Sequence, residues 1–334
     1  MRRTLILGSL ASLAFVPVSS AQAPARIRLG TLVPQGSSYH RILQDMGEKW
    51  KVATSGQVQL TIYAGTMGSE LELVRRMRAG QLQTAMISTT GLASIDRGVA
   101  ALQTIPMMFR TLDELDYVKA RMGPTLEKRL QEKGFKVLAW VDGGWVRFFT
   151  RDKIDQPEEL KKLKTFVTAG ETQQFDLMKS AGYSPVALEW ADALTSLQTK
   201  MIDAVPTIPY FGLATQVYTI ATYMLDLNWA PVVGALVINQ KTWDALSPAQ
   251  QAALSGVALE TGKQFQAQGR KEADEAVQAM QKRGLTVVPI PPPLLTEWRT
   301  ASEQMYPKIR GTMVPADMFD EALRLVTEYR SRPR

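Results

Sequence analysis

The chain of 334 residues contains no cysteine and a single histidine, His40. Without cysteine, the protein can form no disulfide and can carry out no thiol chemistry. One histidine excludes a multi-histidine metal site and the usual Ser-His-Asp triad. We therefore expect no metal, no cofactor and no catalytic residues of these kinds.

The chain also lacks clustered positive charge, although its formal net charge is +7. Lys and Arg alternate with Asp and Glu along the sequence, whereas a nucleic-acid-binding protein gathers its basic residues on one face or in runs. The pattern predicts a solvated surface and no nucleic-acid partner.

The N-terminus has the layout of a secretory signal peptide. Met1, Arg2 and Arg3 form a short positive region, an apolar run "LILGSLASLAFVPV" follows, and "SSAQA" places small residues before a cleavage point after Ala21. The apolar run is too short for a membrane span, and no second long apolar stretch occurs. We expect residues 1–21 to be removed and the mature chain to reside in the periplasm, with export by either the Sec or the twin-arginine route.

The mature chain alternates between strand-like and helix-like segments. Ser69 and Thr111 each precede a helical stretch with glutamate three residues on, the arrangement of a capping box. This alternation is typical of α/β units, whose ligands bind beyond the carboxyl ends of the strands. The predicted strands are 26–33, 58–65, 83–89, 136–142, 145–150, 164–168, 184–188 and 203–207, and the predicted helices include 39–53, 172–181, 191–199, 294–305 and 316–330.

A much longer helix is predicted after Ser247. The segment 247–284 has Ser247 as an N-cap, Pro248 at the first helical position, Gly284 as a stop and no proline between them. At about 1.5 Å per residue, such a helix reaches about 50 Å, long enough to run along two domains. The segment is too polar for a coiled coil.

Four segments, in this order, are similar to one family. They are "GSELELVRRMRAGQLQTAMIST", "FFTRDKIDQPEELKKLKTFV", "AGYSPVALEWADALTSLQTKMIDAVPTIP" and the stretch that begins "LSPAQQAAL". With the leader, they make the chain resemble the extracytoplasmic solute receptors of tripartite ATP-independent periplasmic (TRAP) transporters, the DctP-type binding proteins. The similarity extends over essentially the whole mature chain.

The resemblance implies a fold and a function. The fold is an α/β, two-lobed periplasmic binding protein with mixed sheets, two hinge-crossing strands and a long helix spanning both domains. We predict domain I as 26–146 with 232–265, and domain II as 147–231 with 266–330. The implied receptor is a monomer that captures a small organic acid in the interdomain cleft and delivers it to TRAP membrane permease subunits.

The resemblance also singles out Phe166. The family has an arginine there, which pairs with the carboxylate of the substrate, whereas phenylalanine offers a flat apolar surface and no donors. Phe166 is either a core residue or a stacking wall of the pocket. Thr168 and Thr207 stand nearby, the latter on a rim "DAVPT" without the family's polar residues. An acid with an apolar, branched or aromatic skeleton would suit such a pocket.

Several residues remain as candidates for the other ligand contacts. Arg147 resembles an arginine of the family and would hold a carboxylate, but a one-residue slip in strand register would turn it to the opposite face. The free N–H groups at the N-terminus of the helix that begins near Glu171 are a second candidate for binding an anion. The further candidate contacts are Tyr39, Thr89, Trp145, Tyr210 and Trp229, with Trp190 as additional aromatic wall.

Three function classes follow from the same architecture. A transport receptor needs a closing cleft and no chemistry, and this is the function we expect. A ligand sensor for a membrane kinase would share the fold. A periplasmic enzyme would need a positioned acid–base pair, and Asp192 and Asp203 are the only carboxylates that we predict near the cleft.

Overall fold

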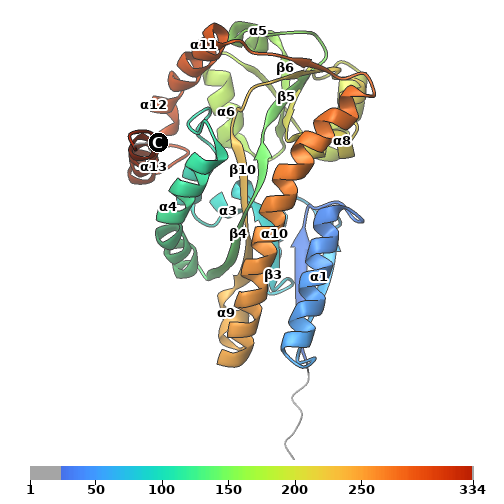
Figure 1. The fold of residues 1–334 in the computed structure, drawn as a ribbon, viewed down its shortest axis with the longest axis vertical. Coiled ribbons are helices and arrows are strands. Elements are labelled where there is room, and N and C mark those ends of the chain that lie inside the picture. The colour runs from blue at the N-terminus through green and yellow to red at the C-terminus, as the bar shows by residue number, and fades with distance from the viewer. Residues whose placement is uncertain (1–23, 333–334) are drawn as a thin grey trace, which may run out of the picture.

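Two β-sheets, one in each lobe, organise the chain (Figure 1). The computed structural model describes residues 24–332. The sheet of the first lobe has the strand order β2-β1-β3-β10-β4, in which β1 runs parallel to β2 and β3, and β10 runs antiparallel to β3 and β4. These strands are β1 (Ala25–Thr31), β2 (Val58–Ala64), β3 (Thr84–Ser88), β4 (Phe135–Trp145) and β10 (Pro231–Asn239).

The sheet of the second lobe is also mixed, with the order β11-β9-β5-β8-β6-β7. Here β5 runs antiparallel to β8 and β9, while β6 runs parallel to β7 and β8. Its strands are β5 (Arg147–Thr150), β6 (Lys164–Thr168), β7 (Ser184–Leu188), β8 (Ala204–Thr207), β9 (Tyr223–Leu225) and β11 (Thr286–Val288). The two mixed sheets confirm the predicted fold class.

Side-chain caps fix the starts of several helices. The side chains of Ser37, Ser69 and Thr111 accept hydrogen bonds from backbone N–H groups three residues on, at 3.1, 3.4 and 3.2 Å. His40 therefore lies in the first turn of α1, which corresponds to the predicted helix 39–53. The α-helices are α1 (Ser38–Ala53), α2 (Glu70–Arg78), α3 (Thr89–Ala93), α4 (Leu112–Glu132), α5 (Pro157–Lys162), α6 (Thr172–Ser180), α7 (Ala193–Gln198), α8 (Pro209–Ala214), α9 (Gln240–Asp244), α10 (Pro248–Gln281), α11 (Pro292–Glu303), α12 (Tyr306–Ile309) and α13 (Ala316–Arg330), and the 3₁₀ turns are η1 (Arg97–Leu102), η2 (Trp190–Asp192) and η3 (Val217–Thr219).

Two strand connections carry the chain from one sheet to the other. The first passes from β4 through Val146 to β5, and the second passes from β9 through Ala230 into β10. They are bonded side by side, because the Val146 N–H donates to the Ala230 carbonyl (2.8 Å) and the Trp229 N–H donates to the Val146 carbonyl (3.2 Å). We had predicted the break between the first pair of strands at the two glycines 143–144. It lies at Val146 instead, because β4 stays paired with β10 as far as Trp145.

The long helix α10 crosses both lobes as a single element of 34 residues (Figure 1). Its N-terminus carries a complete capping box between Ser247 and Gln250. Ala258 packs in the core of the first lobe, with Leu43 and Trp50, whereas Met280 packs in the core of the second lobe. The predicted helix that spans both domains is therefore confirmed.

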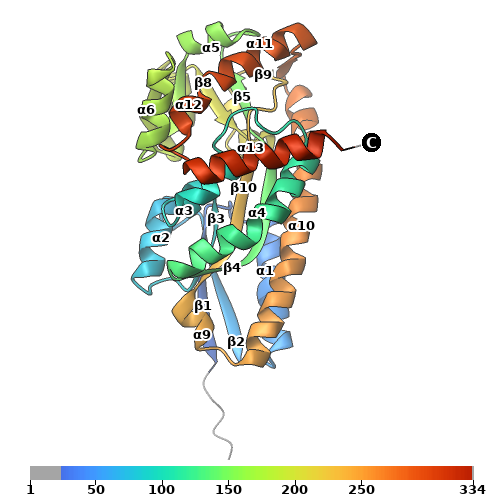
Figure 2. The same cartoon turned by 90° about the vertical axis from the view of Figure 1, so that its left-hand side faces the viewer.

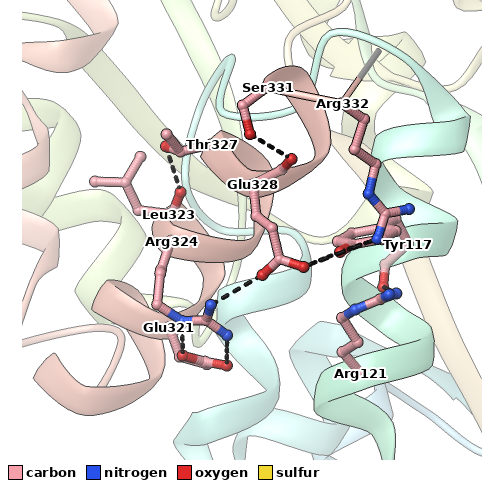
Figure 3. A network of polar contacts seen from close by, with 9 residues as sticks. All are labelled: Tyr117, Arg121, Glu321, Leu323, Arg324, Thr327, Glu328, Ser331 and Arg332. Atoms are coloured by element: carbon pink, nitrogen blue, oxygen red, sulfur yellow. Dashed lines mark hydrogen bonds and ion pairs between the residues drawn. The ribbon is translucent and has the colours of Figure 1, made fainter. Parts of the chain in front are cut away.

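The C-terminal helix α13 returns to the first lobe and lies along α4 (Figure 2). Arg330 donates to both carboxylate oxygens of Glu114, each at 2.9 Å. Figure 3 shows the neighbouring contacts, in which Tyr117 donates to Glu328 and accepts from Arg332. Our predicted division placed residues 266–330 in domain II; these contacts hold α13 against α4 of the first lobe. The rest of that division stays a prediction.

Side chains alternate between the two faces of the second sheet. Phe149, Phe166 and Val205 lie together in one buried cluster, whereas Phe148 and Val167 belong to another on the opposite face. The strand register pairs Phe148 with Pro206 and Arg147 with Thr207, so neighbours on paired strands share a face.

In residues 24–332, no helix is both long and apolar enough to cross a membrane. The predicted signal peptide, 1–21, lies outside the described residues.

Candidate functional site

A cavity of about 400 Å³ lies between the two lobes. The first lobe contributes residues from α2, α3 and η1, and the second lobe contributes β5, β6 and the start of α6. Residues from the strand connections and the C-terminal segment complete the wall. The lining residues with polar, charged or aromatic side chains are Thr89, Thr90, Ser94, Arg97, Gln103, Thr104, Phe148, Phe166, Thr168, Glu171, Thr172, Gln173, Gln174, Tyr183, Trp190 and Trp229.

Glu171 connects the two sides of this cavity. It precedes α6 on the second lobe, and its Oε1 accepts a hydrogen bond of 3.1 Å from the hydroxyl of Thr90, which belongs to α3 on the first lobe. Burial raises the pKa of Glu171 to about 7; the nearby charge of Glu70 adds to this rise, and the hydrogen bond from Thr90 opposes it. This carboxyl group is therefore poised to exchange a proton near neutral pH.

Glu70 holds the first lobe's edge of the cavity in place. Its Oε1 accepts from the Ser88 N–H (2.8 Å), and its Oε2 accepts from the Ser88 hydroxyl (2.6 Å) and the Gly91 N–H (2.9 Å). Burial raises the pKa of Glu70, against the lowering effect of these three hydrogen bonds. The bonds fix the turn from β3 into α3, and with it the position of Thr90.

Aromatic side chains form much of the wall on the second lobe. The rings of Phe166 and Trp190 lie 4.5 Å apart between centroids, and those of Phe148 and Trp229 lie 5.1 Å apart. These separations are those of interacting aromatic pairs. The cavity thus combines flat apolar surfaces with one acidic side chain, Glu171, and one basic side chain, Arg97.

Arg97 is exposed, and its Nη1 donates to the Thr312 carbonyl at 2.7 Å. It therefore offers positive charge at the solvent-facing edge of the cavity, where water screens it.

Four of the nine predicted contact residues line this cavity: Thr89, Phe166, Thr168 and Trp229. The other five lie outside its lining: Tyr39, Trp145, Arg147, Thr207 and Tyr210. Ligand contact by all nine stays a prediction. Phe166 fits both roles proposed for it, because it is only 2% exposed, in a core cluster, and still borders the cavity.

Arg147 forms an ion pair with Asp226. Phe148, the next residue along β5, lines the cavity, and successive side chains of a strand point to opposite faces. Arg147 itself lies outside the cavity lining, and its contact with a ligand stays a prediction.

Tyr39 and Tyr210 make a contact between the lobes outside the cavity lining. Their rings lie 4.9 Å apart at 89°, and Tyr39 also stacks on Phe265 of α10 at 5.3 Å. Trp145, at the end of β4, is half-buried and packs against the larger core cluster.

The acid in the cavity was missed from the sequence. We had named Asp192 and Asp203 as the only carboxylates near the cleft, but neither lines the cavity, and Asp203 instead accepts from the Lys164 N–H at 3.1 Å. Glu171 had been noted only as the start of a helix that would attract an anion. Its position directly after a cavity-lining strand was the available signal.

A two-lobed α/β fold with a cavity lined by both lobes is typical of periplasmic solute-binding proteins. Residues 29–311 match the DctP family, described as bacterial extracellular solute-binding protein, family 7, and the chain therefore belongs to that family. This confirms the resemblance drawn from the sequence motifs.

Two relatives illustrate the range of the similarity. The 2,3-diketo-L-gulonate-binding periplasmic protein of Escherichia coli K12 is 25% identical over 283 residues, which cover 84% of this chain and 85% of that protein. The outer membrane transporter protein TsaT of Comamonas testosteroni is 28% identical over 292 residues, which cover 82% of this chain and 80% of that protein.

Solved structures share the fold. A TRAP periplasmic solute-binding protein of Ralstonia eutropha H16, with bound (S)-2-acetolactate, has a TM-score of 0.83 at 20% identity, covering 91% of this chain and 99% of that one. One from Desulfovibrio desulfuricans, with bound sn-glycerol-3-phosphate, has a TM-score of 0.84 at 18% identity, covering 93% and 99%. These neighbours bear out the two-lobed fold with mixed sheets.

Proposed function

We propose that the protein is the periplasmic receptor of a TRAP transporter, which captures a small organic acid between its lobes and presents it to membrane permease subunits. The observation that carries this proposal is the cavity itself, which neither lobe forms alone. A ligand that contacts both lobes binds the closed arrangement better than the open one, and so shifts the equilibrium toward closure.

The size and walls of the cavity suit a small solute. Ligand sites in proteins are typically concave and about 300–1,000 Å³ in volume, with mostly apolar walls and a few placed polar groups. A cavity of about 400 Å³ lies in the lower part of that range. The E. coli relative is named for a sugar-derived acid, and the R. eutropha neighbour holds acetolactate, which supports an acid as the cargo here.

The chemistry of the cavity favours binding over catalysis. Among residues 24–332, the cavity lining presents one carboxyl group, Glu171, and the only side chain that forms a hydrogen bond with it is the hydroxyl of Thr90. General acid–base chemistry on a bound solute needs a partner group in reach. A receptor with no reaction of its own is the simpler assignment, and the predicted leader would take it to the periplasm.

The test is to identify what the protein carries. The purified protein is denatured, the released small molecules are identified by mass spectrometry, and the candidates are titrated back by calorimetry. We expect one solute to bind with 1:1 stoichiometry and to reduce the radius of gyration in small-angle X-ray scattering. If chemical conversion of the solute accompanies binding, the enzyme alternative replaces this proposal.

A further inference from the structure

Glu171 is half-buried in the cavity lining and, within residues 24–332, has no cationic partner; its neighbour Glu70 has none either, but accepts three hydrogen bonds from Ser88 and Gly91. The Glu171 carboxylate accepts a single hydrogen bond of 3.1 Å, from the hydroxyl of Thr90. Three fully buried acids are paired with cations at 2.9–3.2 Å: Asp142 with Lys119 and Arg270, Asp96 with Arg129 and Lys133, and Glu114 with Arg330.

An unpaired buried carboxylate is costly, because burial removes water without supplying a compensating charge. Glu70 lies near enough to Glu171 to raise its pKa further. Burial and the neighbouring negative charge therefore both disfavour the ionised form of Glu171. In a protein core, glutamine would have nearly the same shape as this glutamate and would avoid the cost of burying an unpaired charge. At the wall of a cavity, the missing partner can come from the bound solute.

The aromatic walls favour the same kind of group. The faces of phenylalanine and tryptophan rings carry negative charge density and attract ammonium or guanidinium groups. Phe166 and Trp190 form one such pair in the lining, and Phe148 and Trp229 form another. Phe166 stands where the resemblance to the family led us to expect an arginine. Because Phe166 and Phe148 are each only 2% exposed, the aromatic surface open to a cation is that of the half-buried Trp190 and Trp229.

We propose that the solute of this receptor carries a positively charged nitrogen, which binds Glu171 between the aromatic walls. The cargo is then a zwitterion, an amino or amidino acid or a betaine, and its carboxylate end faces Arg97 and solvent. This inference rests on the proposed receptor function and specifies the class of organic acid that the receptor takes.

Binding at Glu171 also explains how the cation would promote closure. Glu171 belongs to the second lobe, and its hydrogen-bonded neighbour Thr90 belongs to the first. A cation held at this point interacts with both lobes at once, since the Glu70 carboxylate lies behind Thr90 on the first lobe. The open form would offer it only half of this environment.

The experiment uses matched pairs of probes on the full mature protein, followed by calorimetry. Each cationic or zwitterionic probe is paired with a neutral or purely anionic isostere: choline with 3,3-dimethylbutan-1-ol, 4-aminobutyrate with pentanoate, and a set of amino acids and betaines with the corresponding carboxylic acids. Glu171→Gln removes the charge and keeps the shape, and Glu171→Asp restores the charge. Glu189→Gln is the matched control, because Glu189 is exposed and lies outside the lining.

We expect at least one cationic member to bind about tenfold or more tightly than its isostere, as a charged hydrogen bond would produce. Glu171→Gln should abolish that preference, Glu171→Asp should recover part of it, and Glu189→Gln should leave it unchanged. If acids without nitrogen bind best and Glu171→Gln does not weaken them, this inference is wrong while the receptor function stands. If no probe of either kind binds, and no solute is released on denaturation, both are wrong.

Discussion

Phe166 illustrates how one residue serves both the core and the site. Its ring is buried with Phe149 and Val205 on one face of the second sheet, yet it also contacts Trp190 at the edge of the cavity. The sequence left these two roles as alternatives. In the structure Phe166, the middle residue of β6, belongs to the core and also borders the cavity, while its contact with a ligand stays a prediction.

Phe166→Ala should therefore destabilise the protein as well as weaken solute binding. Removing a fully buried aromatic ring costs about 3–5 kcal/mol of unfolding free energy. Urea unfolding followed by circular dichroism measures the loss. Leu259→Ala is the control, because Leu259 is 57% exposed and its truncation should cost little. A loss below about 1 kcal/mol for Phe166→Ala would place the ring outside the core.

Glu171 should make stability depend on pH in a defined direction. Its pKa is about 7 in the folded protein, whereas an unfolded glutamate titrates near 4.3, so the native state binds more protons between these values. The free energy of unfolding should therefore fall as pH rises from about 4 to about 7 and change no further above it. The neighbouring Glu70, whose pKa burial also raises, acts in the same direction.

Urea unfolding at several pH values, with Glu171→Gln beside the wild type, checks this expectation. Glutamine mimics the protonated acid, so the variant should gain stability relative to the wild type as pH rises through this range. Parallel pH profiles for the two proteins would contradict the assigned role of Glu171.

Only part of the candidate site could be predicted from the amino-acid sequence. Arg147 and Phe148 are adjacent, and the strand pattern shows that they face opposite ways, but it does not show which face the other lobe covers. The burial of Glu171 depends on Thr90, 81 residues earlier in the chain, and on the closeness of the lobes. Neither the face that the other lobe covers nor the burial of Glu171 can be recognised from the residues nearby in the sequence.

At the scale of elements, the sequence was more informative. The spacing of hydrophobic residues and the helix-capping residues predicted the strands, the first helix and the long helix α10. These two signals act within a few residues of each other, so they can be read from the sequence alone. The break between β4 and β5 was misplaced, because Gly144 adopts a φ of 85° while β4 continues past it. Pairing with β10, a contact distant in sequence, decides where that strand ends.

Two glycines of α10 give a matched pair of tests. A Cβ atom at Gly269 would lie 2.9 Å from the Tyr39 hydroxyl and 3.1 Å from the Asp142 carbonyl oxygen, whereas a Cβ atom at Gly256 would have no neighbour within 4 Å. The absence of a Cβ therefore lets α10 approach the hinge strand β4 closely at Gly269 and serves no such purpose at Gly256.

Gly256→Ala should stabilise the protein by up to about 1 kcal/mol, the helix-propensity difference between the two residues. Gly269→Ala should instead destabilise it by about 1–3 kcal/mol, because the contacts cannot relax without moving α10 or β4. Chemical unfolding of the two variants measures both values. Equal stabilisation by both substitutions would show that α10 is free to shift away from the hinge.

At the scale of the whole molecule, the lobes meet at points on either side of the hinge connections. Tyr39 packs on Tyr210, Leu71 lies against Gly170, and Thr90 donates to Glu171. Each pair joins a residue of the first lobe to one of the second. The helix α10 passes between the lobes without lining the cavity, and the strand connections line it only with Val146, Trp229 and Ala230. The direct contacts between the lobes therefore help to decide how firmly the cleft stays shut.

The Thr90–Glu171 hydrogen bond is the polar member of this set, and its removal should favour the open form. Thr90→Val keeps the size of the side chain but leaves the carboxyl group buried without its donor, which costs about 1–3 kcal/mol in the closed form. Opening restores water to the carboxyl group, so the equilibrium should shift that way. Small-angle X-ray scattering should show a larger radius of gyration without solute, and calorimetry should show weaker binding of the released solute. Thr90→Ser, which keeps the hydroxyl group, should behave as the wild type; the same compact radius and the same affinity for all three proteins would mean that the apolar contacts alone hold the lobes together.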